Sequence, residues 1–479
     1  MRESSPVGST MKSRFLILLV GFPLAGLCDA QSGSDVSDPA APKQQDVDMA
    51  KEIESLKQRL SDVEAFQGTK AAPEQAEGGD ADDSDQDTTR GEDAGLNLRA
   101  NDRQLTGEDL IDESFPRSWP LFGSDYRMAI GGYVKLDLLK DFSGTGDRFQ
   151  FVTSTIPVEG TAEANRGGYT NIFARETRIH FDVRRTNAGG HPEKYFLEFD
   201  FFDNGENPYQ TKARLRHAYM IQGRLLAGRT WGTLTDVRSL VQTIDFAAGD
   251  ALNGARVAQI RWEDKLSDRT KWAVALESQE FFDIDDVADQ GGKGTMSWPN
   301  LVARIIREWD HGFTLFGGQI GQLNWDGEGV GPDADALQWY LAWSGRYAPT
   351  PSNYFVWNAS YGNGAANSIL SFVGTGGNAV LTPSGELETM PDWNVSLGYG
   401  HKLSSELAAN LGLAHAGIDP SDLRASDSMK SGGTAHANLI WTATDALSTG
   451  IEYMVGQRTN ADGADGKAHR LQCMVKYSF

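Results

Sequence analysis

The sequence predicts an all-β protein: a transmembrane antiparallel β-barrel of about 16 strands, preceded by a short N-terminal coiled-coil helix. From Tyr126 to the C-terminus, apolar and polar side chains alternate with a period of two, so each segment has one apolar and one polar face. Short and long connections alternate between these segments, as they do in outer-membrane barrels. After residue 30 no apolar run approaches the roughly 20 residues of a membrane-spanning helix.

The composition argues against several classes of protein. The chain has 479 residues, with 66 acidic and 44 basic side chains and a formal net charge of −22, whereas nucleic-acid binding calls for a basic surface. Its two cysteines are too few for a disulfide scaffold or a multi-cysteine zinc site. The sequence has no G-x-S-x-G, H-E-x-x-H or phosphate-loop motif, so it predicts neither an enzyme nor a bound metal or cofactor.

Residues 1–30 have the pattern of a secretory signal peptide. Lys12 and Arg14 precede the apolar run 15–27, and the small residue Ala30 follows shortly afterwards. Two alternatives are weaker. A bulky leucine stands before the nearby cysteine, which disfavours lipid attachment, and the apolar run is too short for an uncleaved membrane anchor.

The next part of the chain is strongly acidic, with 22 acidic against 8 basic side chains in residues 31–114. Residues 31–67 are predicted to form a periplasmic coiled-coil segment, because apolar residues recur there at heptad spacing; an isolated amphipathic helix is the alternative. These apolar residues are Met49, Ile53, Leu56, Leu60 and Val63. Residues 68–95 have almost no large apolar side chain and should be disordered, and residues 68–119 as a whole are predicted to form an acidic flexible linker. Residues 120–479 are then the barrel.

Sixteen segments of the barrel region alternate as strands do. The last is the clearest, because Leu471, Val475 and Phe479 share one face while Arg470 and Lys476 lie on the other. The predicted strands are 126–140, 171–185, 193–203, 211–222, 223–231, 255–264, 269–279, 299–308, 311–323, 336–348, 352–364, 391–401, 406–418, 430–441, 446–457 and 467–479. In lipid such a sheet must close on itself to satisfy its backbone. A barrel of this size is too wide for side chains to fill and should enclose water.

Alternation also predicts which basic side chains point into the lumen. In the fifth segment, for example, Leu226, Gly228 and Thr230 are assigned to the outer face, which turns Arg229 inward. Rings of arginine select anions, and opposed rows of arginine and carboxylate create a transverse field. The alternative is that these cations only pair with neighbouring Asp and Glu in the barrel wall. The candidate pore residues are Lys135, Arg178, Arg214, Arg216, Arg229, Arg238, Arg261 and Arg304.

One long connection, residues 232–254, follows the fifth predicted strand. It contains an apolar patch together with Arg238 and several aspartates. In general porins a loop at this position folds into the lumen and sets the constriction. We expect the same here, with Arg238 at the constriction; an ordinary extracellular loop is the alternative.

Several segments resemble the DcaP-type trimeric outer-membrane porins. They are GGYVKLDLLKDF (131–142), ARETRIHFDVRR (174–185), YFLEFDFF (195–202), RLRHAYMIQGRLLAGRTWGTLTD (214–236) and the terminal VKYSF. The run 214–236 is the most specific of these. The resemblance implies a sixteen-stranded trimeric channel for small dicarboxylate-like anions, with an N-terminal periplasmic coiled coil.

The predicted function is therefore an outer-membrane porin that passes small anionic solutes, dicarboxylate-like in character, through an arginine-lined lumen. We expect a homotrimer in the cell outer membrane of a Gram-negative bacterium, in contact with outer-membrane lipid and lipopolysaccharide, with its N-terminal segment in the periplasm. The alternatives are a phosphate-selective or general porin, and a structural or adhesin protein that the barrel anchors.

Overall fold

The computed structural model describes residues 115, 117–121, 125–144, 146–164, 166–185, 193–204, 211–280 and 282–479. The predicted signal peptide and coiled coil, and all of the predicted linker before residue 115, lie outside these residues. They remain predictions.

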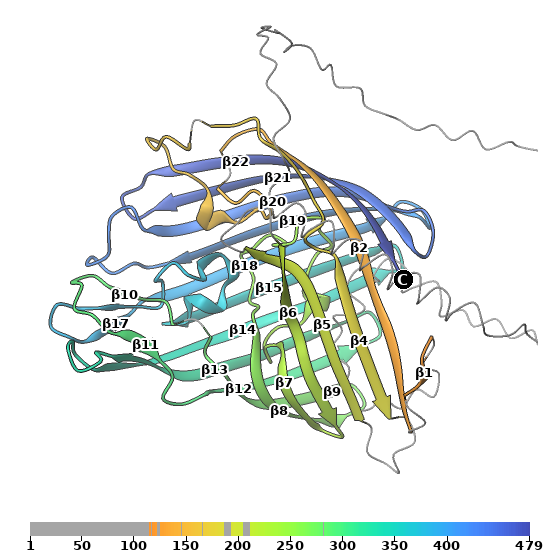
Figure 1. Cartoon of the computed structure of the whole chain (residues 1–479), viewed down its shortest axis with the longest axis horizontal. Helices are drawn as coiled ribbons and strands as arrows, with labels where there is room; N and C mark the ends of the chain where they lie inside the picture. Colours follow the sequence, from red (N-terminus) through yellow and green to blue (C-terminus); the bar gives the residue numbers. More distant parts are fainter. Residues whose placement is uncertain are drawn as a thin grey trace, which may run out of the picture. The chain divides into compact units, whose positions relative to one another are not determined.

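Sixteen membrane-spanning strands, one of them split into two segments, form a closed antiparallel sheet (Figure 1). Each strand pairs with the next along the chain, and the last strand pairs with the first, which closes the cylinder. The predicted count is confirmed. The strands are β2 (Tyr126–Asp141), β3 (Thr170–Phe173) continued by β4 (Arg178–Arg185), β5 (Glu193–Asn204), β6 (Thr211–Gln222), β7 (Leu225–Trp231), β8 (Arg256–Ser267), β9 (Thr270–Glu277), β12 (Asn300–Trp309), β13 (Gly312–Asp326), β14 (Ala334–Thr350), β15 (Asn353–Asn363), β18 (Pro391–Lys402), β19 (Leu407–Ile418), β20 (Met429–Thr442), β21 (Leu447–Asn460) and β22 (Asp465–Ser478).

Smaller elements lie outside the spanning strands. Strand β1 pairs with the start of β2, β11 pairs with β13, and β10, β16 and β17 form a separate three-stranded sheet. Their bounds are β1 (Trp119–Pro120), β10 (Ile284–Asp286), β11 (Lys293–Thr295), β16 (Ala379–Leu381) and β17 (Leu387–Thr389), with the 3-10 helices η3 (Thr153–Thr155), η4 (Val237–Ser239), η5 (Ala366–Ser368) and η6 (Leu370–Phe372). In the part of the chain that the structure describes, no helix is long and apolar enough to cross a lipid bilayer.

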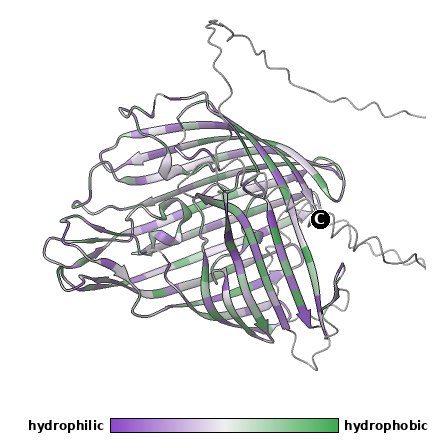
Figure 2. Cartoon of the chain, viewed as in Figure 1, coloured by the Kyte–Doolittle hydropathy of each residue, from purple (hydrophilic) through white to green (hydrophobic). Residues whose placement is uncertain are grey.

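The two faces of the sheet differ as the alternation predicts. Along β2, Val134 and Leu136 are 53% and 48% exposed, whereas Lys135 and Asp137 between them are 2% and 1% exposed. Figure 2 shows the same alternation as stripes of apolar and polar residues along the strands. An apolar outer face suits lipid and a polar inner face suits water, so this is the surface of a membrane barrel.

The wall departs from simple alternation at the second predicted strand, which is split. Residues 174–177 leave the ladder between β3 and β4, so Arg175 and Arg178 are both buried although they differ in parity. Gly132 faces this break with a φ of +149°, and a Cβ there would lie 2.2 Å from the carbonyl oxygen of Arg178. Only glycine fits this close approach.

A second departure lies between β5 and β6. The register passes from Glu198 opposite His217 to Phe199 opposite Leu215, so Arg216 is an additional residue in β6. This bulge buries two consecutive side chains, Arg216 and His217, on the inner face.

Candidate functional site: the lumen wall and the inner loop

The connection between β7 and β8, residues 232–255, runs inside the barrel, and we call it the inner loop. Leu234 packs with Val302 of β12 and Tyr340 of β14, and Ile244 packs with inward residues of β20 and β22. The prediction that this loop folds into the lumen is confirmed by these contacts with inward-facing side chains.

Three inward asparagines of the second half of the barrel bond to the backbone of the inner loop, and a fourth supports one of them. The Asn358 side chain accepts a hydrogen bond from the backbone N–H of Asn253 (3.2 Å), and Asn394 donates to the carbonyl of Ala251 (3.2 Å). These two asparagines bond to each other, and Asn410 bonds to Asn438 in the same way. Asn438 in turn donates to the carbonyl oxygen of Gln242 at 2.9 Å. Neutral amides thus satisfy loop groups that water would otherwise solvate.

Glu452 of β21 is the charged anchor of the loop. Its carboxylate accepts hydrogen bonds from the backbone N–H groups of Ile244 (2.9 Å) and Asp245 (3.0 Å) and from the side chains of Asn438 and His436. Glu452 and His436 are 0% and 2% exposed. A buried carboxylate needs several donors of this kind, because desolvation is otherwise costly.

Two aspartates of the inner loop hold the long connection that follows β2. Asp245 accepts a hydrogen bond from the backbone N–H of Phe151 (3.0 Å), and Asp250 accepts from both the N–H and the hydroxyl of Thr153 (2.8 Å each). Burial raises the pKa of Asp245 to about 7 and that of Asp250 to about 6. The anchoring of the loop therefore depends on groups that titrate near neutral pH.

The charged part of the wall centres on Arg216, which is 1% exposed. Its guanidinium donates to Glu198 (2.6 Å) and to Asp200 (2.9 Å) on the neighbouring strand β5. Arg214 also binds Asp200, through two hydrogen bonds of 2.9 and 2.7 Å. Arg178 lies 3.9 Å from Glu198. Three candidate arginines therefore share two buried carboxylates.

Lys135 links the wall to the inner loop. Its ammonium group contacts Glu176, lies 3.1 Å from Asp137, and donates to the carbonyl oxygen of Ile244 at 2.7 Å. Arg304 of β12 has the same double role, because it pairs with Glu263 and donates to the carbonyl oxygen of Thr233 (2.8 Å). Both predicted cations face inward, and both support the loop as well as the wall.

Arg238 lies within the inner loop, as predicted, and is held against the wall. It binds Asp236 in the loop (2.7 Å) and Glu308 of β12 (3.0 Å), and its guanidinium lies 4.0 Å from the ring centroid of Phe313. Burial would raise the pKa of Asp236, but the adjacent Arg238 outweighs it and lowers that pKa.

The prediction that Arg229 faces the lumen is wrong. Arg229 pairs with Ala258, two residues from Ile260, which is 58% exposed on the outer face. Thr230 is 2% exposed and faces inward, where its hydroxyl contacts His217. Arg229 instead forms an ion pair with Glu280 on the outside of the barrel. The error arises because Leu226 is an apolar residue that packs inward against Ile221 of β6.

Most of the predicted pore cations have acidic partners in the wall. Seven of the eight candidates lie within 4.0 Å of a carboxylate, which is the alternative that the sequence left open. The eighth, Arg261, is 2% exposed, and its Nε and Nη1 atoms have no hydrogen-bond partner among the described residues. Most of these carboxylates lie on a strand next to that of their cation. The ion pairs therefore run along the wall and do not reach across the lumen.

The candidate pore residues left out several inward cations, among them Arg470, which pairs with Asp141, and two further ones. Lys476 of β22 is 5% exposed, and Arg346 of β14 stacks 3.9 Å from the ring centroid of Tyr354. Within the described residues neither has a carboxylate at ion-pair distance. The alternation at the C-terminus already puts Lys476 on the polar face. The signal for Arg346 is weaker, because Gly345 and Ala348 interrupt the pattern near the end of β14.

No group of three or more His, Cys, Asp or Glu side chains in the described ranges is arranged to hold a metal ion. Lys135, Arg178 and Lys476 instead line a small cleft of about 60 Å³ beside the inner loop, together with Glu176, Asp245, Tyr133 and Phe246. The cleft thus combines three cations with two acids and two aromatic rings.

A closed sixteen-stranded barrel with a loop folded into its lumen defines a porin-type channel. A sequence profile of the DcaP outer membrane protein family matches residues 116–479, more than half of the chain. The chain belongs to that family, and this membership places the barrel in the outer membrane of a Gram-negative bacterium.

A solved structure of the same family name shares the fold. The crystal structure of the outer membrane channel DcaP of Acinetobacter baumannii is similar with a TM-score of 0.65 and 21% sequence identity, over 76% of this chain and 100% of that chain. Two others are OmpT of Vibrio cholerae (TM-score 0.47, 11% identity, 75% of this chain and 99% of that one) and an anion-selective porin from Comamonas acidovorans (0.49, 9%, 74% and 100%). A search of curated proteins found no match.

Proposed function

We propose that the barrel is a water-filled channel for small anionic solutes, with a preference for those carrying two carboxylates. The observation that carries the proposal is an asymmetry within two ion pairs of the lumen, although in two others, Lys135 with Glu176 and Arg304 with Glu263, the carboxylate is the more exposed partner. The side chain of Arg214 is 33% exposed and that of its partner Asp200 is 0% exposed; for Arg238 and Asp236 the values are 30% and 9%. The cation faces the solute path while the carboxylate lies behind it.

Two inward carboxylates without an ion-pair partner among the described residues accept hydrogen bonds from backbone N–H groups. Glu277 accepts a hydrogen bond from the backbone N–H of Thr233, and Asp392 accepts from that of Ala365 (3.0 Å). These acids are buried and satisfy loop backbone, so they contribute less to the field in open water than the half-exposed guanidinium groups do. A guanidinium fork binds a carboxylate through two parallel hydrogen bonds, and several such forks favour solutes with two carboxylates.

Planar-bilayer recordings test the proposal. With a salt gradient across the membrane, the reversal potential should show anion preference, and succinate should permeate or block better than acetate. Phosphate and an uncharged sugar complete the panel. Cation preference would refute the proposal, and a stronger effect of phosphate than of succinate would favour a phosphate channel instead.

We further propose that the channel is a homotrimer, and that the outer faces of β7 to β9 contribute to the subunit contact. This region carries the outward ion pair of Arg229 with Glu280, and Arg256 stacks there 4.4 Å from the ring centroid of Trp231. Charged side chains on a lipid-facing surface are destabilising, so a polar patch suits protein better than lipid. Arg229→Leu should weaken the trimer in native mass spectrometry. A trimer more stable in the variant than in the wild type, or a wild type that is already monomeric, would contradict this contact.

The N-terminal segments complete the proposal. Residues 1–30 direct export, residues 31–67 form a periplasmic coiled coil that reinforces the trimer, and residues 68–119 link it to the barrel. Deletion of residues 31–114 should leave solute flux unchanged in the channel reading. If that deletion abolished function while the barrel still conducted, the adhesin alternative would stand instead.

A further inference from the structure

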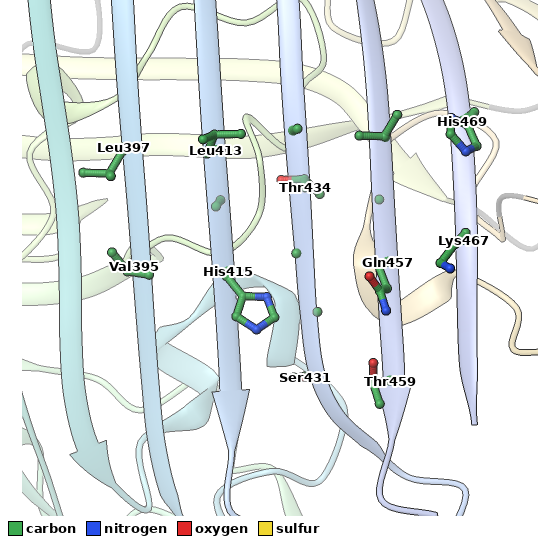
Figure 3. A pocket seen from close by; sticks show the side chains of 16 residues that line it. Val395, Leu397, Leu413, His415, Ser431, Thr434, Gln457, Thr459, Lys467 and His469 are labelled. Carbon is green, nitrogen blue, oxygen red and sulfur yellow. The ribbon is translucent and has the colours of Figure 1, made fainter. Parts of the chain in front are cut away.

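A hollow lies on the outer, membrane-facing side of β18 to β22. It has a volume of about 660 Å³, and Figure 3 shows the side chains around it. The sheet register explains the hollow, because small residues of β20 stand between larger ones. Ala435 lies between Leu413 of β19 and Val455 of β21, all on the outer face. We call this hollow the outer groove.

The next row of the outer groove toward the extracellular side is polar. There Gly433 of β20 lies between His415 and Gln457, and Gln457 is paired with Lys467 of β22. Consecutive outward residues of a strand are about 6.6 Å apart, since each residue rises about 3.3 Å. The surface therefore changes from aliphatic to hydrogen-bonding within one row.

The polar row lies at the extracellular end of the strands. Between β21 and β22 the chain turns at residues 461–464, and between β19 and β20 it turns at residues 419–428; both turns are at the opposite end from the C-terminus. The short connections 403–406 and 443–446 join these strands at the other, periplasmic end. The outer groove thus spans the hydrocarbon and headgroup levels of the outer leaflet.

Lys467 supplies the positive charge of this row. Its side chain is 65% exposed and forms a long ion pair of 3.7 Å with Asp465, which leaves most of the ammonium group open to solvent. The rings nearby have partners of their own, since His469 bonds to the Tyr453 hydroxyl (3.0 Å) and His415 lies against Trp393. The ammonium group remains the accessible donor for an anion.

We propose that the outer groove binds lipid A, the phosphorylated glycolipid of the outer leaflet, with one acyl chain along β20 and a phosphate at Lys467. The groove opens toward hydrocarbon, so its occupant is a membrane component with an apolar tail. The polar row and the cation above it complement an anionic headgroup better than a zwitterionic one. This site is separate from the lumen, and its occupation does not depend on which solutes the channel passes.

The test uses the full chain purified from outer membranes in mild detergent. Bound lipid is identified by native mass spectrometry, and lipid A is then titrated into delipidated protein. Ala435→Leu fills the groove with an apolar side chain that the outer face tolerates, and Lys467→Gln removes the charge alone. The matched control is Ala303→Leu, which makes the same change on the outer face of β12.

We expect lipid A on the wild type and on Ala303→Leu, and none on Ala435→Leu. Lys467→Gln should bind about tenfold more weakly, as expected for loss of a charge-assisted hydrogen bond. Three results would overturn the proposal: unchanged binding by Ala435→Leu, equal binding of zwitterionic phospholipid by the wild type, or a lipid-free wild type whose trimer Ala435→Leu dissociates. The last would make the groove a contact between copies of this chain.

Discussion

The two halves of the barrel are built differently. From β2 to β12 the inner face carries buried ion pairs, the second strand is split, and the register between β5 and β6 shifts twice. From β13 to β22 the strands run 11 to 17 residues, and their inner faces carry mainly amides and small residues, with the buried pairs of Glu452 with His436 and of Arg470 with Asp141 as charged exceptions. Register shifts in this half are confined to strand ends, at Tyr347 and at Met429.

This difference indicates that the two halves of the wall have different roles. Ion pairs between neighbouring strands need large side chains packed side by side, and a bulge such as that at Arg216 provides an extra inward position. Neutral amides need no such distortion, because they fit the regular ladder and bond to the loop. The first half thus supplies charge to the solute path, and the second half positions the inner loop within it.

The largest predicted effect comes from removing a shared carboxylate of the charged half. Asp200→Ala leaves buried Arg216 without one of its two acids and Arg214 without its only one, so we expect a loss of about 3–5 kcal/mol in unfolding free energy. Asn410→Ala, in the amide half, should cost only about 1–3 kcal/mol. Urea unfolding of both variants in lipid measures the contrast, and equal losses would remove the distinction between the halves.

A charge placed on the lipid-facing side of a strand tests the assignment of the outer surface, whose apolar character should be the same in both halves of the barrel. Leu341→Arg, near the middle of β14, should destabilise the barrel by about 2–4 kcal/mol. The control, Leu337→Arg, lies nearer the strand end and should cost about 0–1 kcal/mol. Unfolding free energies decide it, and a dependence that does not follow depth would contradict the assigned lipid face.

The role of the amide half is tested by Asn438→Ala. This change removes a donor to Gln242 and to Glu452, and should lower the free energy of local opening of the inner loop by about 1–3 kcal/mol. Hydrogen exchange at the backbone amides of Ile244 and Asp245 reports the opening. Gln319→Ala removes an inward amide of β13 for which no bond to the loop is found, and should leave the exchange unchanged.

A pH titration tests how the inner loop itself holds the connection that follows β2. Asp245 and Asp250, which face His436 and Glu452, have pKa values raised from 3.8 to about 7 and about 6 by burial. Their contribution to loop stability is complete below the unfolded value of 3.8 and is lost as pH rises through 6 to 7. Protection factors at Phe151 and Thr153 should fall over that range. In Asp250→Asn the protection factors should fall less over this pH range. Protection factors that rise with pH would contradict the predicted direction.

The smallest effect on stability is expected for Arg214→Ala. Because this side chain is half-exposed and Arg216 still binds Asp200, the unfolding free energy should change by no more than about 1 kcal/mol. Anion preference in the reversal potential should nevertheless weaken. Arg269→Ala removes the same charge at an exposed periplasmic turn and is the control; an equal shift in both variants would mean that net charge, not position, sets selectivity.

Alternation predicted the strands well because lipid enforces it. In the second half, Leu397 and Val475 point outward as expected, and strand ends fall within three residues of the predicted ones. Long outer side chains there are apolar away from the strand ends, and polar ones such as Gln457 and Lys467 lie toward the extracellular end. The same rule misassigned Arg229, because inside the barrel Leu226 can pack against other protein. Bulges and the break near Arg175 also shift parity without any change in composition, so pairing register, not sequence pattern, decides those positions.

The partners of the cations could not be read from the sequence at all. Arg178 and Arg216 share Glu198, and Lys135 reaches Ile244 of the inner loop, through contacts between segments far apart in the chain. The sequence showed that cations and acids are both inward. Which of them remains accessible depends on exposure within each pair, and that follows from the three-dimensional packing.

The seam between β2 and β22 has a consequence for biogenesis. The final residue, Phe479, donates its backbone N–H to the carbonyl oxygen of Gly132, next to the first spanning strand's inward Tyr133. Until that last segment arrives, the first strand keeps a row of unpaired donors and acceptors that hydrocarbon cannot tolerate. A chain that lacks β22 is thus a template for unwanted pairing, and the barrel cannot close before that strand has been made.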